Sequence, residues 1–119
     1  METLESRLHA LDQMITEGKI LETLEPFFAE PCRFVEMTNG ASRESRAAQH
    51  EHLSGFFATL KGFNGATLLS SAIQGDTSLS EWRFDMEAGD GSQILWNEVL
   101  VRRWENGSVV EEKYYNATA

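Results

Sequence analysis

The apolar residues of this 119-residue chain change their spacing once, close to residue 65. Before that point they recur every three or four residues, which is the period of an amphipathic helix. After it they alternate with polar residues, which is the period of a β-strand. Helices followed by strands predict an α+β fold, and the length is that of one domain. We therefore expect a single domain over residues 1–119.

The first half of the sequence predicts three helical segments, with a short strand between the second and the third. Thr3 is a suitable N-cap and Gly18 a suitable C′ residue for the first helix. Pro26 lies inside the second segment, so either a kinked helix or two short pieces is expected. The predicted bounds are 4–17 for the first helix, 20–28 for the second segment, Cys32–Met37 for the strand, and Arg43 to about Lys61 for the third helix, with Ser42 as its N-cap.

The second half predicts a meander of four strands. Asn106-Gly107 is the strongest hairpin signal in the chain, because both residues tolerate a positive φ angle. Gly75-Asp76 indicates a second tight turn, and Gly89-Asp90-Gly91 a looser loop. The predicted strands are Thr67–Gln74, Ser78–Glu87, Gln93–Glu105 and Ser108–Tyr115.

A two-residue loop at Asn106-Gly107 would place Glu105 opposite Ser108 and fix which side chains share a face. Both predicted faces are largely apolar, and a two-layer domain buries only one of them. A homodimer that pairs through the sheet is the simplest prediction. A β-bulge would shift the assignment of the faces. One predicted face carries Trp96, Glu98, Leu100, Trp104, Val109, Glu111 and Tyr115, and the other carries Leu95, Asn97, Val99, Val101, Val110, Glu112 and Tyr114.

The chain is acidic, with a net charge of −9 that opposes binding to nucleic acids and to anionic membrane surfaces. The carboxylates are dispersed, which is typical of a solubilising surface and identifies no cationic substrate. Cys32 is the only cysteine, so no internal disulfide is possible. The acidic N-terminus does not resemble a signal peptide, and no apolar run is long enough for a membrane span. We expect a cytoplasmic protein.

Three stretches carry a resemblance to a known superfamily. Residues 97–115 contain an acidic residue, alternating valines, an Arg-Trp pair, Asn-Gly, and a Glu before two tyrosines. Ser80-Glu81-Trp82 is similar to a middle strand in which an acidic residue and a tryptophan recur, and Glu36 lies ahead of the third helix. Together with the order of the elements, these features resemble the nuclear transport factor 2-like superfamily, which includes SnoaL-like and ketosteroid-isomerase-like domains.

This resemblance implies a cone-shaped, curved antiparallel sheet wrapped around N-terminal helices, with a pocket between the two layers and often a homodimer. Glu36 and Trp82 would complete that pocket, although Trp82 also suits the core. The superfamily hosts isomerases, cyclases, dehydratases, epoxide hydrolases and non-catalytic domains, so the fold does not fix one chemistry. Its catalytic members commonly place an Asp or a His–Asp combination inside the cone. Here the last strand has Glu112 and Tyr114, and no histidine lies in a predicted strand.

Glu98 is the first candidate for chemistry, because it lies between Trp96 and Leu100 on an apolar face. Burial among apolar groups would raise its pKa and suit a general acid or base. The alternative is a structural ion pair with Arg102 or Lys113. On the other predicted face, Glu112, Tyr114 and Asn97 would bind a carbonyl or hydroxyl ligand, unless Glu112 lies in water and Tyr114 covers the core.

Other chemistry has little support in the sequence. His9, His50 and His52 lie in predicted helices and suggest no metal site, and no nucleotide or cofactor motif is present. Two hypotheses follow. One is a binding domain for a small hydrophobic molecule, either without catalysis or as a cofactor-independent acid–base enzyme, and the other is a non-catalytic homodimeric module. A cavity of roughly 300 Å³ or more with a buried carboxylate would favour the first. A filled cone or salt-bridged carboxylates would favour the second.

Overall fold

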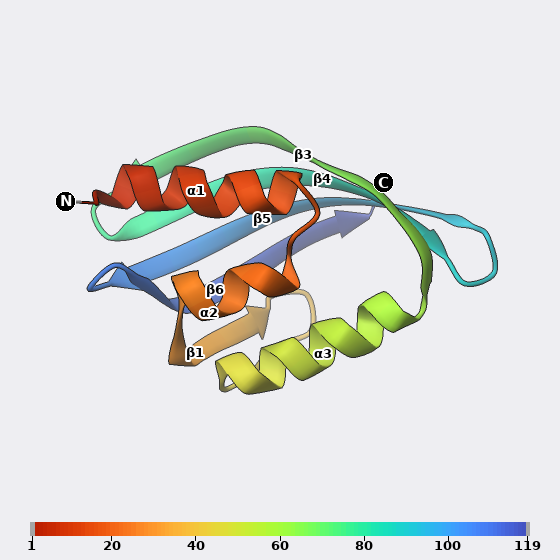
Figure 1. The fold of residues 1–119 in the computed structure, drawn as a ribbon, viewed down its shortest axis with the longest axis horizontal. Helices are drawn as coiled ribbons and strands as arrows, with labels where there is room; N and C mark the ends of the chain where they lie inside the picture. The colour runs from red at the N-terminus through yellow and green to blue at the C-terminus, as the bar shows by residue number, and fades with distance from the viewer. Residues whose placement is uncertain (1, 119) are drawn as a thin grey trace.

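The computed structural model describes residues 2–118 and contains one six-stranded sheet with the order β2-β1-β6-β5-β4-β3 (Figure 1). The four long strands form the predicted meander: β3 (Leu60–Gln74), β4 (Thr77–Ala88), β5 (Gln93–Glu105) and β6 (Ser108–Thr118). β1 (Phe28–Glu36) pairs with β6 in parallel, and β2 (Ser42–Arg43) pairs with β1 in antiparallel orientation. The α+β prediction is therefore confirmed, but the sheet is mixed rather than purely antiparallel.

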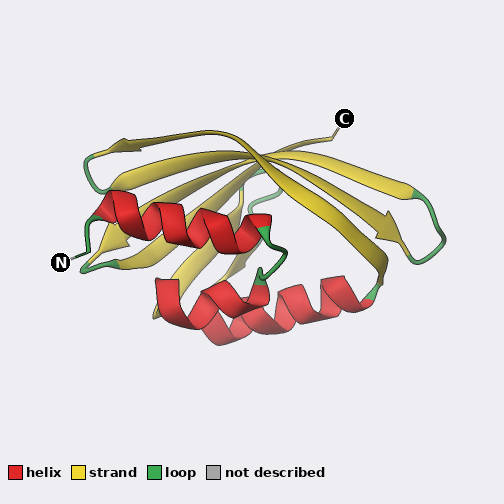
Figure 2. Ribbon diagram, turned by 45° about the horizontal axis from the view of Figure 1, so that its top comes forward, coloured by secondary structure: helices red, strands yellow, loops and turns green. Residues whose placement is uncertain are grey.

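The helices cover one face of the curved sheet (Figure 2). They are α1 (Leu4–Thr16), the 3₁₀ turn η1 (Leu21–Thr23), α2 (Leu24–Phe27) and α3 (Arg46–Ala58). α1 begins at the predicted cap, where the Thr3 hydroxyl accepts a hydrogen bond from the Ser6 amide at 3.0 Å. The run around Pro26 forms two short pieces, as one of the two alternatives expected. None of the described helices is long and apolar enough to cross a bilayer.

The third helix and the strand after it have different bounds from those predicted. Ser45, not Ser42, caps α3, and its hydroxyl accepts from the Ala48 amide at 3.0 Å. Ser42 is instead paired with Val35 in the sheet. The helix ends at Ala58, and β3 begins at Leu60 with three register shifts near its glycines and Leu68. Gly62 and Gly65, which directly follow the predicted third helix, therefore lie in a bulged strand.

The hairpin at Asn106-Gly107 has the predicted register at its tip and a bulge immediately after it. Glu105 pairs with Ser108 and Trp104 with Val109, but Arg103 pairs with Glu111, so Val110 is the extra residue. The predicted faces are consequently wrong beyond the bulge. Glu112, Tyr114 and Asn116 share the inner face with Glu98, Leu100 and Arg102, whereas Glu111 and Tyr115 lie on the outer face.

The core lies between the inner face of the sheet and the helices. Trp82, Leu100, Trp104 and Val109 from the sheet pack with Leu11 and Phe34, and all are at most 4% exposed. The opposite face retains exposed apolar side chains, among them Leu79, Leu95 and Tyr115. The inner, concave face, which the helices cover, is therefore the one on which an internal site would lie.

Candidate functional site

A cavity lies between the inner face of the sheet and the helices. Its volume is about 130 Å³ when measured as the space open to the centre of a water-sized sphere, and about 850 Å³ when all empty space is counted, including open solvent. The volume of about 130 Å³ is below the roughly 300 Å³ expected for a drug-sized ligand. It is close to the volume of an engineered cavity that holds benzene. Seven aromatic side chains form much of its wall, namely Phe28, Phe56, Phe57, Phe63, Phe84, Trp96 and Tyr114.

Glu98 lines this cavity from β5 and has no counter-ion among the described residues. Asn116 Nδ2 donates to Glu98 Oε2 at 2.9 Å, which leaves Oε1 without a protein partner among residues 2–118. Burial, followed by the charges of Glu112 and Glu36, raises the pKa of Glu98 to about 8, although Asn116 and Arg102 partly oppose this shift. Neither Arg102 nor Lys113 pairs with Glu98, because Arg102 is bound to other carboxylates and Lys113 lies 3.8 Å from Glu111.

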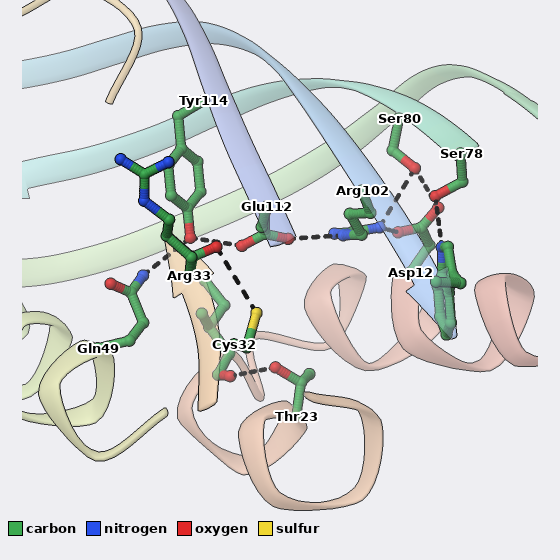
Figure 3. A network of polar contacts seen from close by, with 12 residues as sticks. Asp12, Thr23, Cys32, Arg33, Gln49, Ser78, Ser80, Arg102, Glu112 and Tyr114 are labelled. Atoms are coloured by element: carbon green, nitrogen blue, oxygen red, sulfur yellow. Dashed lines mark hydrogen bonds and ion pairs between the residues drawn. The ribbon is translucent and has the colours of Figure 1, made fainter. Parts of the chain in front are cut away.

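Arg102 is fully buried and joins two carboxylates from different elements (Figure 3). Its Nε donates to Glu112 Oε2 at 2.6 Å, and its Nη1 donates to Asp12 Oδ1 of α1 at 3.0 Å. Burial disfavours the charged guanidinium, but Glu112 and Asp12 outweigh this effect and raise the pKa of Arg102. Ser80 donates to Asp12 Oδ2 at 2.8 Å, so both oxygens of Asp12 are also bonded.

Polar contacts continue from Glu112 across the cavity wall to the surface. The Tyr114 hydroxyl donates to Glu112 Oε1 and accepts from Gln49 Nε2 at 2.8 Å (Figure 3). Gln49 Oε1 accepts from Arg43 Nε at 2.7 Å, and Arg43 Nη2 binds Glu36 at 2.8 Å. Burial and then Glu112 raise the pKa of Tyr114, so the phenol keeps its proton. That proton is committed to Glu112 and is not free for a ligand.

The structure brings together five of the seven residues that the sequence singled out. Those that line the cavity are Glu36, Trp96, Glu98, Glu112 and Tyr114. Trp82 is not among the lining residues, because it is 0% exposed and stacks on Phe84 with ring centroids 5.6 Å apart. Asn97 also lies outside the cavity, because its neighbours Trp96 and Glu98 take the inner face; it accepts a 3.4 Å hydrogen bond from Arg83 on the outer side. Both assignments to a ligand site are corrected accordingly.

Three buried polar residues of the network were not predicted. Asp12 is 3% exposed, Gln49 1% and Arg102 0%. Two of them interrupt an apolar pattern: Asp12 lies four residues after Leu8 on the α1 stripe, and Arg102 alternates with Leu100 and Trp104. A polar side chain in an apolar register is the signal that would have identified them, because such a position is costly unless the group finds partners.

Histidine and cysteine contribute little to this site. His52 lines the cavity but is exposed, and His9 and His50 lie elsewhere. Cys32 is fully buried, and burial raises the pKa of its thiol far above the ordinary range, so it is not an activated nucleophile. Within residues 2–118, no group of three His, Cys, Asp or Glu side chains is arranged to hold a metal ion.

Comparison with solved structures shows which fold this is. A candidate SnoaL-like polyketide cyclase from Mesorhizobium loti is 17% identical, with a TM-score of 0.86 over 96% of this chain and 99% of that one. A nuclear transport factor 2-like protein of unknown function from Burkholderia pseudomallei is 12% identical, with a TM-score of 0.81 over 98% and 92%. A hypothetical protein with a ketosteroid isomerase-like fold from Catenulispora acidiphila, in complex with trimethylamine, is 16% identical, with a TM-score of 0.77 over 95% and 86%.

Sequence comparison adds no closer assignment. No protein-family model matches the chain, and no curated protein matches it. The structural matches all lie below the identity at which an activity can be transferred, so they establish the architecture alone. The chain has the nuclear transport factor 2-like fold, which SnoaL-like and ketosteroid isomerase-like proteins share.

Proposed function

We propose that this protein binds a small hydrophobic molecule in the cavity beside Glu98, and that Glu98 transfers a proton to or from it if the protein is an enzyme. The observation that carries the proposal is a carboxyl group without a counter-ion, set on an aromatic wall with one oxygen unbonded. Glu98 is half-buried, and a carboxylate that is partly removed from water without a counter-ion is stabilised by a ligand or by a proton. With a pKa of about 8, Glu98 exchanges protons near neutral pH.

The size of the cavity limits the ligand. A space of about 130 Å³ accommodates one six-membered ring or a branched group of similar size. A longer ligand would have to extend through the mouth, where His52 is exposed. We therefore propose a single-ring or similarly compact compound, with acid–base chemistry of the isomerase, dehydratase or hydratase type that requires no cofactor.

Of the two candidate glutamates, only Glu98 is left to act as the acid or base. Both oxygens of Glu112 already accept hydrogen bonds, one from Arg102 and one from Tyr114. Tyr114 in turn has no free proton with which to polarise a carbonyl. We assign Glu112 and Tyr114 to holding the cavity wall in place, and Trp96 to contacting the ligand next to Glu98.

Other proteins of this fold are consistent with small-molecule binding. One is a candidate polyketide cyclase, and another is in complex with trimethylamine. These descriptions concern proteins at most 17% identical to this chain, so they support a cavity that takes small ligands without naming the ligand. The single buried cysteine suits a reducing compartment, in keeping with the proposed cytoplasmic location.

The second candidate function is a non-catalytic homodimeric module. Three observations favour it. The cavity of about 130 Å³ is smaller than the roughly 300 Å³ that would favour a ligand site. Three carboxylates, Asp12, Glu36 and Glu112, are salt-bridged, and the outer sheet face exposes Leu79, Leu95 and Tyr115. An apolar sheet face of this kind suits a second copy of the chain. Sedimentation equilibrium of the wild type and of Leu95→Lys tests it: a dimer that Leu95→Lys dissociates supports the homodimer, and a monomeric wild type rules it out.

The proposed ligand site is tested by the ionisation of Glu98. Carbon-13 NMR of the labelled carboxyl between about pH 3 and 9 is expected to give an apparent pKa well above the ordinary value of about 4.3. Small ring compounds bearing a carbonyl, hydroxyl or amine would then be screened against the wild type and Glu98→Gln. An ordinary pKa for Glu98, together with no saturable binding, would rule out this function.

A further inference from the structure

The polar groups around Glu98 have an unequal balance of charge. Besides Glu98 itself, three carboxylates and two guanidinium groups line the cavity or form an ion pair with a side chain that lines it. A third guanidinium group, that of Arg46, donates to the backbone oxygens of Glu25 and of Phe28 and pairs with none of these carboxylates. Among the ion-paired groups one negative charge remains before Glu98 is counted, and an ionised Glu98 would add a second. This excess opposes an anionic ligand and favours a cationic one. The titratable or charged groups that face this region are Asp12 of α1, Glu36 of β1, Arg43 of β2, His52 of α3, Arg102 of β5, and Glu112 and Tyr114 of β6.

Neither guanidinium group forms an ion pair with Glu98, although Nη2 of Arg102 is buried without a hydrogen-bond partner among the described residues. Arg102 is held between Asp12 and Glu112 at 3.0 and 2.6 Å. Arg43 is held by Glu36 at 2.8 Å and by Gln49 at 2.7 Å. The protein thus supplies a counter-ion to every buried carboxylate in this region except Glu98. A ligand is the remaining source of positive charge for it.

The wall next to Glu98 also suits a cation. Trp96 precedes Glu98 by two residues on the same face of β5 and stacks on Phe56, with ring centroids 5.2 Å apart. The ring centroid of Phe57 lies 5.7 Å from that of Phe56 in a tilted contact and 6.3 Å from that of Phe63 in an edge-on contact. The faces of aromatic rings attract ammonium groups, tryptophan most strongly, and the attraction is larger where water is excluded.

We infer that the ligand of this cavity is a small hydrophobic amine bound in its protonated form, with the ammonium group donating to Glu98 Oε1 and the hydrocarbon part packed on Trp96 and Phe56. This inference rests on the proposed function and names its ligand class. The volume of about 130 Å³ restricts the hydrocarbon part to about one ring. The dispersed surface carboxylates are not involved, since the selectivity comes from one enclosed carboxyl group.

The sign of the pH dependence separates this class from a neutral one. In the free protein Glu98 holds a proton below pH of about 8. An ammonium ligand stabilises the carboxylate, so its binding releases that proton, and its affinity rises with pH up to about 8 by as much as tenfold per pH unit. A neutral ligand whose carbonyl or hydroxyl oxygen accepts a hydrogen bond from the protonated carboxyl loses that bond when Glu98 ionises, so its affinity falls above about pH 8.

The experiment compares cyclohexylammonium with cyclohexanol, which have the same ring and differ in charge. Titration calorimetry would be run between about pH 6 and 9, with each pH measured in two buffers of different ionisation enthalpy. We expect cyclohexylammonium to bind at least about tenfold more tightly than cyclohexanol at pH 8 and to release nearly one proton per site at pH 7. Glu98→Gln should abolish the proton release and most of the affinity. Glu81→Gln, the same change at an exposed position on the outer face, should alter neither.

The outcomes distinguish this inference from the proposed function. Cyclohexanol that binds as well as the ammonium, with an affinity that falls above about pH 8, overturns the amine and keeps the Glu98 site. Failure of cyclohexylammonium to bind at millimolar concentration also overturns the amine. An ordinary Glu98 pKa with no binding of either compound removes the proposed function itself.

Discussion

Glu98 and Glu112 lie on neighbouring strands, on the same face of one sheet and along the same cavity, yet their hydrogen-bond partners differ. Glu112 is 4% exposed, accepts from Arg102 and Tyr114, and belongs to a chain of contacts that links α1 to the strands. Glu98 has one neutral partner, Asn116, and faces the cavity. The two residues are of the same type, so their hydrogen-bond partners decide the role of each carboxylate. A paired carboxylate fixes the architecture, and an unpaired one is available for a ligand or a proton.

The largest loss of stability should come from removing Arg102, the cation that pairs with Glu112 and Asp12. Arg102→Met leaves Asp12 and Glu112 buried without a counter-ion, which should cost about 3–5 kcal/mol in the free energy of unfolding. Urea denaturation at pH 7 measures it. Arg103→Met removes the neighbouring arginine, whose 3.0 Å ion pair with Glu105 is half exposed, and should cost at most about 1 kcal/mol. Equal losses in the two variants would contradict the distinction.

Should Arg102→Met fail to fold, Asp12→Asn provides a milder form of the same test. It leaves Arg102 paired with Glu112 and keeps an oxygen that can accept from Ser80 or Arg102. We expect a loss of about 1–3 kcal/mol, smaller than for Arg102→Met, because only one charged hydrogen bond is weakened. A stability equal to that of the wild type would mean that Asp12 does not contribute to the network.

The second effect is the contribution of Glu98 to stability, which depends on pH. The pKa of Glu98 is about 8 in the folded state and lies near 4.5 when the chain is unfolded, so between these values the folded state binds the extra proton. Stability is therefore highest below about pH 4.5 as far as this group is concerned, and falls by at most about 1.4 kcal/mol per pH unit up to about pH 8.

Glu98→Gln removes that dependence and isolates it from all other groups. The free energy of unfolding of the variant minus that of the wild type should increase from about pH 5 to about pH 8 and then level off. Urea denaturation at each pH gives the difference. A difference that does not change with pH would show that Glu98 ionises alike in the folded and unfolded chains, as a carboxyl exposed to water does.

A smaller loss of stability is expected from removing the hydroxyl of Tyr114. Tyr114→Phe removes the hydroxyl that donates to Glu112 and accepts from Gln49, leaving one oxygen of Glu112 and the Gln49 amide unpaired. The loss should be about 1–3 kcal/mol in urea denaturation. Tyr115→Phe is the matched control, because Tyr115 is 44% exposed on the outer face, and it should change stability by less than about 0.5 kcal/mol. If the two variants lose the same amount, the hydroxyl of Tyr114 has no structural role.

The sequence predicted the order of elements and the hairpin because these depend on local chemistry. Thr3 caps α1 and Asn106-Gly107 forms the turn through interactions within a few residues. The bulge at Val110 is not local in this sense: nothing in the alternation of residues 108–115 shows that one residue is skipped. That single residue exchanged the faces of Glu111 and Glu112, and so separated Glu112 and Tyr114 from Asn97.

Five of the seven residues singled out from the sequence line the cavity, but the sequence predicted the surroundings of only one of them, Glu98, because its own strand provides them. Glu98 lies between Trp96 and Leu100, and the structure keeps this neighbourhood. Its lack of a counter-ion depends on Asp12, which is 90 residues from Arg102 along the chain and competes for that arginine. Pairings at such separations follow from how α1 lies on the sheet, and spacing along the sequence does not encode them.

The smallest effect tests how little supports the charge of Glu98. Asn116→Leu removes the one hydrogen bond that favours the ionised carboxyl while filling similar space, so the pKa of Glu98 should rise further, by about one pH unit. Carbon-13 NMR of the labelled carboxyl measures the change, and Asn97→Leu, on the outer face of the same strand as Glu98, should produce none. An unchanged pKa in Asn116→Leu would mean that water or another group supports the charge. Glu98 would then resemble Glu112 more closely than its contacts indicate, and the contrast between the two ends of the cavity would narrow.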